Sequence, residues 1–77
     1  MNIYVGNLPY GLDRGELRAT FAAFGEVSSA RIVTDRETNK SKGFGFVEMT
    51  NDTEGQKAID ELNGAEYDHK VIAVSIA

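Results

Sequence analysis

Apolar and polar residues alternate in four segments of the chain, which is typical of β-strands with one buried face. These segments cover residues 2–6, 27–34, 42–49 and 71–76. In the first segment, Ile3 and Val5 are expected to point into the core. In the last, Ile72, Val74 and Ile76 are expected to do the same. The pattern predicts four strands that share one core.

The segment between the first two strands has the periodicity of an amphipathic helix. Its apolar residues recur at i, i+4 and i+7, and they are Leu17, Phe21 and Phe24. Asp13, followed three residues later by Glu16, predicts an N-terminal cap in which each side chain bonds the other residue's backbone N–H. Gly25 is expected to end the helix, because glycine readily adopts the left-handed conformation that follows many helices.

A second helix is predicted from about Asp52 to Asn63, with Ala58, Ile59 and Leu62 on its inner face and Gly64 at its exit. The elements then follow the order βαββαβ. Each βαβ crossover is right-handed, so both helices lie on the same face of one sheet. We therefore expect an α+β fold, a ferredoxin-like βαββαβ sandwich of a four-stranded antiparallel sheet and two helices.

The other face of this sheet has no predicted helix to cover it, and it displays three aromatic residues. In the third strand, alternation places Phe44 and Phe46 on the same side as Lys42 and Glu48. Because charged side chains lie toward solvent, both rings are predicted to be exposed. The same reasoning exposes Tyr4 in the first strand. Exposed rings suit flat ligands, and stacking of a nucleobase on an aromatic ring contributes roughly 1–3 kcal/mol.

Residues 42–49 also resemble the octapeptide of the RNA recognition motif, Lys/Arg-Gly-Phe/Tyr-Gly/Ala-Phe-Val-x-Phe/Tyr. Residues 3–8 resemble the hexapeptide of that family, and residues 35–38 and 62–64 fit its usual pattern. The similarity extends along the whole chain, so residues 1–77 are expected to form a single domain of this family. The resemblance is strongest to the small single-domain RNA-binding proteins of bacteria, including cyanobacteria.

The resemblance implies a strand order of 4-1-3-2 and an RNA-binding site on the open face. Tyr4 and Phe44 would each stack on a base. Phe46 would pack on the sugars between them, and Lys42 would contact a phosphate. The secondary candidates for RNA contact are Asn2, Arg31, Val33, Lys40, Glu48 and Ser75. The outward side chains of the last strand are short, which predicts a weak sequence preference.

Several residues depart from the family pattern. Met49 occupies the last octapeptide position, usually aromatic, where an adaptable side chain can fill the core. His69 stands where a turn glycine is common. Gly15 and Gly55 lie inside the predicted helices, where each is expected to cost about 1 kcal/mol relative to alanine. We therefore expect modest stability.

Composition narrows the classes of function further. A chain of 77 residues has room for one domain, and with no cysteine and a single histidine it offers no thiol chemistry and no Cys-based metal site. No apolar run approaches the roughly 20 residues of a membrane span. The strand pattern begins so early that it leaves no space for a targeting peptide. We expect a cytoplasmic monomer without a cofactor, a metal ion or a membrane association.

The formal net charge of −4 is unusual for a protein that binds nucleic acid. The charge is unevenly distributed, because basic residues outnumber acidic ones in 31–47 whereas acidic residues dominate 48–69. The acidic segment is interpreted as the solvated face of the second helix. A binding face elsewhere on the molecule can still be neutral or positive.

The leading hypothesis is a non-enzymatic protein that binds short single-stranded RNA, with single-stranded DNA as a further ligand. The main alternative is a protein-interaction module on the same fold, in which the acidic second helix meets a basic partner. A cold-shock barrel has a similar Lys-Gly-Phe-Gly-Phe strand but no helices. An acylphosphatase-like enzyme would need an arginine in the turn 7–11, which has none. A phosphate-binding loop at 43–45 would need a following Lys-Ser/Thr pair, which is also missing.

Overall fold

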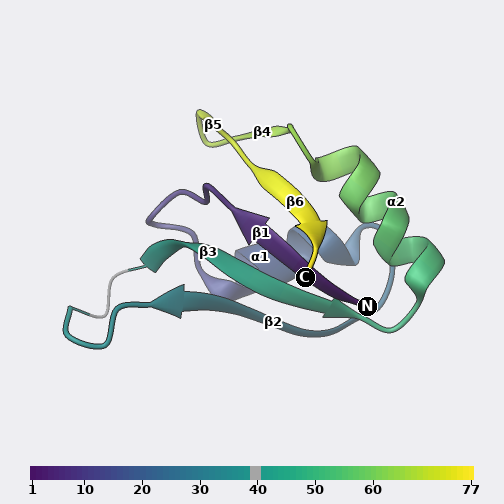
Figure 1. Cartoon of the computed structure of the whole chain (residues 1–77), viewed down its shortest axis with the longest axis horizontal. Coiled ribbons are helices and arrows are strands. Elements are labelled where there is room, and N and C mark those ends of the chain that lie inside the picture. Colours follow the sequence, from purple (N-terminus) through teal and green to yellow (C-terminus); the bar gives the residue numbers. More distant parts are fainter. Residues whose placement is uncertain (39–40) are drawn as a thin grey trace.

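The computed structural model describes residues 1–38 and 41–77, and it confirms the predicted fold class. In chain order, the larger elements are β1 (Asn2–Gly6), α1 (Arg14–Ala22), β2 (Val27–Thr34), β3 (Ser41–Met49), α2 (Asp52–Leu62) and β6 (Ala73–Ile76). A short hairpin of β4 (Glu66–Tyr67) and β5 (Lys70–Val71) precedes β6. Figure 1 shows α1 behind the sheet and α2 beside β6.

The four long strands form one antiparallel sheet in the order β2-β3-β1-β6. With β6 as the fourth strand of the sheet, this is the predicted order 4-1-3-2, which is thereby confirmed. β1 and β3 are central neighbours, and β2 and β6 are the two edges. The two strands that carry the predicted aromatic residues therefore lie side by side.

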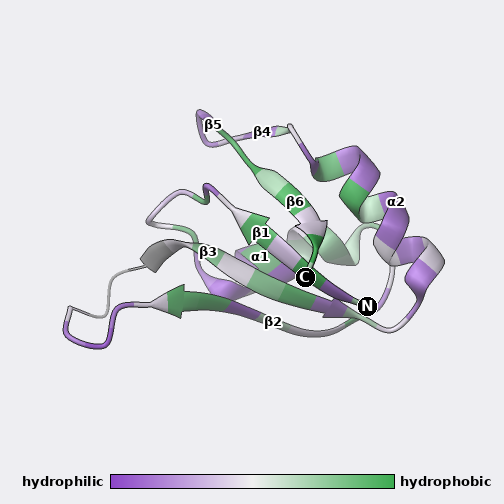
Figure 2. Ribbon diagram, in the orientation of Figure 1, coloured by the Kyte–Doolittle hydropathy of each residue, from purple (hydrophilic) through white to green (hydrophobic). Residues whose placement is uncertain are grey.

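A single core fills the space between the sheet and both helices. The buried residues from the sheet include Ile3, Val5 and Val47, whereas Phe21 comes from α1 and Ala58 from α2. In Figure 2, hydrophobic and hydrophilic residues alternate along the strands, and α2 carries a largely hydrophilic outer side. None of the helices described by the structure is long and apolar enough to cross a membrane.

The first helix begins after Asp13 as predicted, with one of the two expected cap bonds confirmed, but it ends earlier. The Asp13 carboxylate accepts a hydrogen bond of 2.8 Å from the backbone N–H of Glu16. The helix ends at Ala22, and the N–H of Phe24 closes a tighter turn by donating to the carbonyl of Phe21 at 3.0 Å. The prediction that Gly25 ends this helix is therefore wrong, and Gly25 does not adopt a positive φ. A side chain at Gly25 would instead collide with the side chain of Glu54 from α2.

The second helix ends within one residue of the predicted boundary. The Asn51 side chain caps it by accepting from the backbone N–H of Glu54 at 2.9 Å. Gly64 follows the helix with a φ of +84°, the left-handed conformation expected at a helix exit. Gly55 is buried inside the helix, where an added Cβ would come within 2.7 Å of the Met1 sulfur.

The predicted last strand, 71–76, divides into two parts. Val71 pairs with Glu66 in the small hairpin, and only residues from Ala73 onward join the main sheet. The N–H of Ile72 donates to the carbonyl of Ala65 at 3.0 Å, which turns the chain between the two pairings. Ile72 and Val74 are buried as predicted.

The prediction that the Ile76 side chain is part of the core is wrong. This residue is 60% exposed, although it follows the alternation of Ile72 and Val74. The reason is its position at the last residue of an edge strand, which has a neighbouring strand on one side only. Periodicity assigns a face of the sheet, but burial also requires that other side chains cover that face.

Candidate nucleic-acid interface

Three aromatic side chains form a cluster on the sheet face opposite the core. The antiparallel register sets Tyr4 of β1 opposite Phe46 of β3, and Gly6 opposite Phe44. The centroid of the Tyr4 ring is 5.9 Å from those of both Phe44 and Phe46. The two phenyl centroids are 6.2 Å apart. All three rings are partly exposed, so the structure brings the predicted residues together on one uncovered surface.

The rings are tilted against one another and do not lie in one plane. Tyr4 is inclined by 52° to Phe44 and by 48° to Phe46, and the two phenyl rings are nearly perpendicular, at 87°. Edge-to-face contacts of this kind are favourable between aromatic rings. Each ring therefore offers a separate contact surface, which suits several bases and sugars in succession better than one extended flat ligand.

Gly6 determines how the Tyr4 ring lies. A Cβ at Gly6 would come within 2.7 Å of the Tyr4 hydroxyl oxygen and within 3.1 Å of the ring edge. The phenol therefore lies along β1, over the backbone of Gly6. Gly6 was not among the predicted site residues, although an aromatic residue and a glycine at two same-face positions of one strand are a signal of such packing.

Two glycines of β3 set the position of the phenylalanines. At Gly45, an added Cβ would collide with the backbone carbonyl of Arg31 and come within 3.2 Å of the Ile32 Cα. Gly43 has a φ of +84°, next to an irregularity in the register of β2 and β3. Its carbonyl accepts a hydrogen bond of 2.8 Å from the N–H of Leu8. These close backbone contacts hold β3 firmly between its neighbours.

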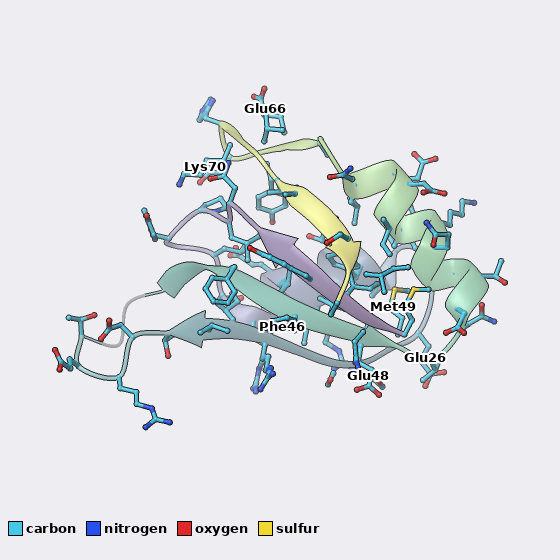
Figure 3. All side chains as sticks on the ribbon, viewed as in Figure 1. Glu26, Phe46, Glu48, Met49, Glu66 and Lys70 are labelled. Carbon is cyan, nitrogen blue, oxygen red and sulfur yellow. The ribbon has the colours of Figure 1, made fainter. Side chains whose placement is uncertain are left out.

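Arg31 extends the cluster toward the β2 edge. It pairs with Phe46 across the strands, and its guanidinium carbon lies 5.3 Å from the centre of that ring. This distance is typical of a cation–π contact. A hollow beside Phe46 is lined by polar residues that include Asn2, Ser29, Arg31 and Glu48. Figure 3 shows Phe46 and Glu48 on the same strand near the centre of the view.

The remaining candidates are less closely associated with the rings. Ser75 of β6 is exposed and pairs with Tyr4 on the side away from β3. Val33 is half-buried in β2, at the register irregularity after Ile32. Lys42 belongs to β3, but its side chain lies outside the described part of the structure, and so does the whole of Lys40.

Comparison with known proteins decides the family. The sequence profile of the RNA recognition motif matches residues 3–73. This chain belongs to the RNA recognition motif family. The family assignment made from the octapeptide and the hexapeptide is therefore confirmed.

Relatives of this RNA recognition motif differ widely in length. RbpD of Nostoc sp. is 47% identical over 77 residues, which are 100% of this chain and 82% of that protein. RNA-binding protein CP31B, a chloroplast protein of Arabidopsis thaliana, is 48% identical over 97% of this chain. The chain spans only 26% of the length of CP31B. A crystal structure of RNA-binding protein PG1 superimposes with a TM-score of 0.98 at 45% identity, covering 100% of this chain and 93% of that one.

One exposed aromatic residue of this RNA recognition motif was missed in the sequence interpretation. Tyr10, in the turn after β1, is 69% exposed and would be 3.7 Å from a Cβ at Gly43, the residue before Phe44. The Lys70 ammonium lies 4.6 Å from the centre of the Tyr10 ring. A tyrosine beside a proline in a turn follows no alternation, so periodicity alone cannot assign it to a face.

Within the described residues, no three His, Asp or Glu side chains lie close enough together to hold a metal ion. Buried side-chain polar atoms without a partner are also absent from this part of the chain. Among the described side chains, the site offers three aromatic rings, the Arg31 guanidinium and, at its rim, polar groups that include Asn2, Ser29 and Glu48.

Proposed function

We propose that this chain is a single RNA-binding domain that binds short single-stranded RNA on the open face of its sheet, without catalysing a reaction. The observation that carries this proposal is the cluster of Tyr4, Phe44 and Phe46, with ring centroids 5.9 to 6.2 Å apart on an uncovered face. Exposed rings cost hydration free energy, and stacked bases recover it by covering them.

Each ring has a distinct role in the proposal. Tyr4 and Phe44 stack on two bases, because they belong to adjacent strands and present separate faces. Phe46 packs on the sugars between them, with the Arg31 guanidinium beside it as a donor to phosphate. Lys42 contacts a further phosphate. A face of this size holds two or three bases, so the affinity of the domain for RNA is modest.

Family membership and the names of relatives support the ligand class. CP31B and PG1 are both described as RNA-binding proteins. Because the chain matches only part of CP31B, binding by this domain is a proposal about residues 1–77 and not about a longer protein. Binding of single-stranded DNA, a monomeric state and a cytoplasmic location stay predictions.

The test is a titration of the isotope-labelled chain with mixed short single strands, RNA and DNA in parallel. We expect chemical-shift changes centred on Tyr4, Phe44 and Phe46, with RNA producing them at lower concentration than DNA. Changes confined to the outer side of α2, or none in the presence of excess RNA, would contradict the proposal. Equal responses to RNA and DNA would show that the 2′-hydroxyl does not contribute, and the ligand would then be single-stranded nucleic acid in general.

A further inference from the structure

The outer edge of the sheet, along β2, carries a second surface with its own chemistry. A groove between α1 and β2, with a volume of about 510 Å³, is lined by Arg14, Gly15, Arg18, Ser28, Ser29 and Ala30. Figure 1 shows that β2 is the edge strand on this side of the sheet and that α1 lies behind it. The groove contains small residues, hydroxyl groups and two guanidinium groups but no aromatic ring, so its chemistry suits a phosphate better than a base.

This groove is continuous with the aromatic cluster through shared residues. Ser29 lines both the groove and the hollow beside Phe46. A third hollow, around the start of α1, is lined by both Arg14 and Arg31. Arg31 in turn lies over Phe46. A path of cationic and hydroxyl groups therefore leads from the rings, around the β2 edge, to the side of α1.

The two arginines of α1 lie one turn apart on the same side of the helix. The Arg18 guanidinium donates to the backbone carbonyl of Val27 at 2.9 Å, which holds it at the β2 edge. An arginine carries five N–H donors, so others are left for a ligand. Arg14 makes no ion pair with any residue that the structure describes.

Acidic side chains lie beside parts of this path. Glu48 lines the hollow beside Phe46 and pairs with Ser29 across the strands. Asp13 lines the third hollow, but its carboxylate caps α1 by accepting from the N–H of Glu16. The Glu16 side chain lies on the opposite side of the helix, in a hollow shared with Asp68. The groove itself is lined by two arginines and by no carboxylate, so in a chain of net charge −4 it is a surface on which a polyanion meets arginine.

We propose that Arg14 and Arg18 bind backbone phosphates of a single-stranded RNA whose bases lie on the sheet and whose chain continues over the β2 edge. This extension rests on the proposed function. The planar guanidinium groups bind phosphate oxygens in the bidentate manner that arginine favours, and the Ser29 hydroxyl donates from the facing strand. The extended site accepts any sequence, because it contacts only the backbone.

The test compares RNA that covers only the sheet with RNA that reaches beyond it. A three-nucleotide RNA is measured against the same RNA extended by several nucleotides at its 5′ end or at its 3′ end. We expect extension at one end to tighten binding by the wild-type chain at low salt, roughly threefold for each added phosphate contact. The Arg14→Gln variant is expected to lose much of this gain, and Arg14→Gln combined with Arg18→Gln all of it, with the short RNA bound as before.

Salt dependence provides a second readout. The slope of log K against log salt concentration for the extended RNA should become shallower by about 0.7 for each arginine replaced. Lys57→Gln is the matched control, because it removes one positive charge from α2 and not from the groove. This variant should bind the extended RNA more tightly than the short RNA by the same factor as the wild-type chain. Arg14→Lys retains the charge and should retain most of the gain. Thermal unfolding checks that loss of the Arg18 contact to Val27 has not disturbed the fold.

Three results would overturn the extended site. One is equal affinity of the wild-type chain for the short and extended RNAs. Another is an equal loss for both RNAs in Arg14→Gln, which would indicate an effect on the sheet itself. The third is that Lys57→Gln loses as much of the gain from RNA extension as Arg14→Gln does, which would indicate that only the net charge of the protein matters. A wild-type chain that binds none of these RNAs would refute the proposed function as well, so the two failures are distinguishable.

Discussion

The open face of the sheet and the outer side of α2 are both exposed to solvent, yet they carry opposite chemistry. The sheet face displays three partly exposed aromatic rings with Arg31 beside them. The side of α2 displays exposed carboxylates, among them Asp60, which accepts a 3.0 Å hydrogen bond from Gln56. A charged outer side is expected for any amphipathic helix that faces solvent, so the α2 surface needs no ligand to explain it. The rings are not explained by folding, and their exposure points to a ligand that covers them.

The contrast also explains how an acidic protein can bind a polyanion. Half of the twelve acidic residues lie in 52–68, in α2 and the segment after it, whereas the groove lined by Arg14 and Arg18 holds no carboxylate. Charges separated by more than about 10 Å interact weakly at 0.1 M salt. Local charge therefore matters more for RNA binding than the net charge of the chain. The carboxylates of α2 disfavour binding of RNA to the helical side of the molecule, which carries none of the three rings.

The sharpest way to break this comparison is to remove a ring from the sheet face. Phe44→Ala and Phe46→Ala should each weaken binding of single-stranded RNA, roughly 5- to 150-fold for a loss of 1–3 kcal/mol. Fluorescence anisotropy with labelled RNA measures the affinity, and thermal unfolding measures stability. Val71→Ala, which shortens a side chain that is 56% exposed outside the cluster, is the control and should bind normally. Unchanged affinity in both ring variants would remove the basis of the proposed site.

A substitution beneath the rings should act through stability. In Gly45→Ala the new methyl group meets the backbone of β2, which cannot move aside as a flexible side chain can. We expect the free energy of unfolding to fall by about 1–3 kcal/mol, the usual range for overpacking. Urea denaturation measures it. Gly11→Ala is the matched control, because a Cβ there meets nothing within 4 Å. Equal stability of the two variants would show that β2 and β3 tolerate a wider spacing.

The acidic side of α2 should matter much less for RNA. Reversing charge with Asp60→Lys and Glu61→Lys should tighten RNA binding by no more than about threefold at low salt, and the effect should disappear as screening increases. Anisotropy titrations at several salt concentrations measure this. A loss of affinity for RNA on charge reversal would contradict the assignment of RNA binding to the sheet face and not to α2. A protein partner that binds the wild-type chain and is lost in this variant would support the alternative function for α2.

The smallest expected effect concerns the β4–β5 hairpin. Asp68 and His69 both have positive φ values, of 50° and 67°, as a two-residue hairpin turn requires. Since glycine adopts this conformation without the steric cost of a side chain, His69→Gly should stabilise the fold by about 0.5–1 kcal/mol. His69→Ala removes the same ring without relieving the backbone and should not stabilise. Differential scanning calorimetry compares the two variants, with RNA binding unchanged in both.

Local pattern was sufficient for most of the fold. The bounds of β1 and β2 agree with the sequence prediction, and Asp13 caps α1 as expected through the N–H of Glu16, since alternation and capping depend on residues close in the chain. Of the reciprocal pair of cap bonds that was predicted, this is the one that the structure confirms. The errors have a different origin. At position 25 a residue larger than glycine would collide with the side chain of Glu54 of α2. The interruption of the last strand at Ile72 comes from the hydrogen bond that its N–H donates to the carbonyl of Ala65. Both depend on contacts that no local pattern contains.

The candidate site divides in the same way. That Tyr4, Phe44 and Phe46 face away from the core follows from the period of two, and the octapeptide and hexapeptide identify the family. Tyr10 and the groove at Arg14 and Arg18 could not be recognised, because the residues that flank them come from different elements.

Residue order alone thus establishes which side chains share a face, because a strand alternates and a helix repeats over distances of a few residues. It does not establish which faces meet. Tyr4 reaches Phe46, and Arg31 reaches the same ring, only through hydrogen-bonded registers between strands far apart in the chain. Strand pairing is determined by long-range packing of the whole core, and at position 45 it also depends on a close approach of the β2 backbone that only glycine permits.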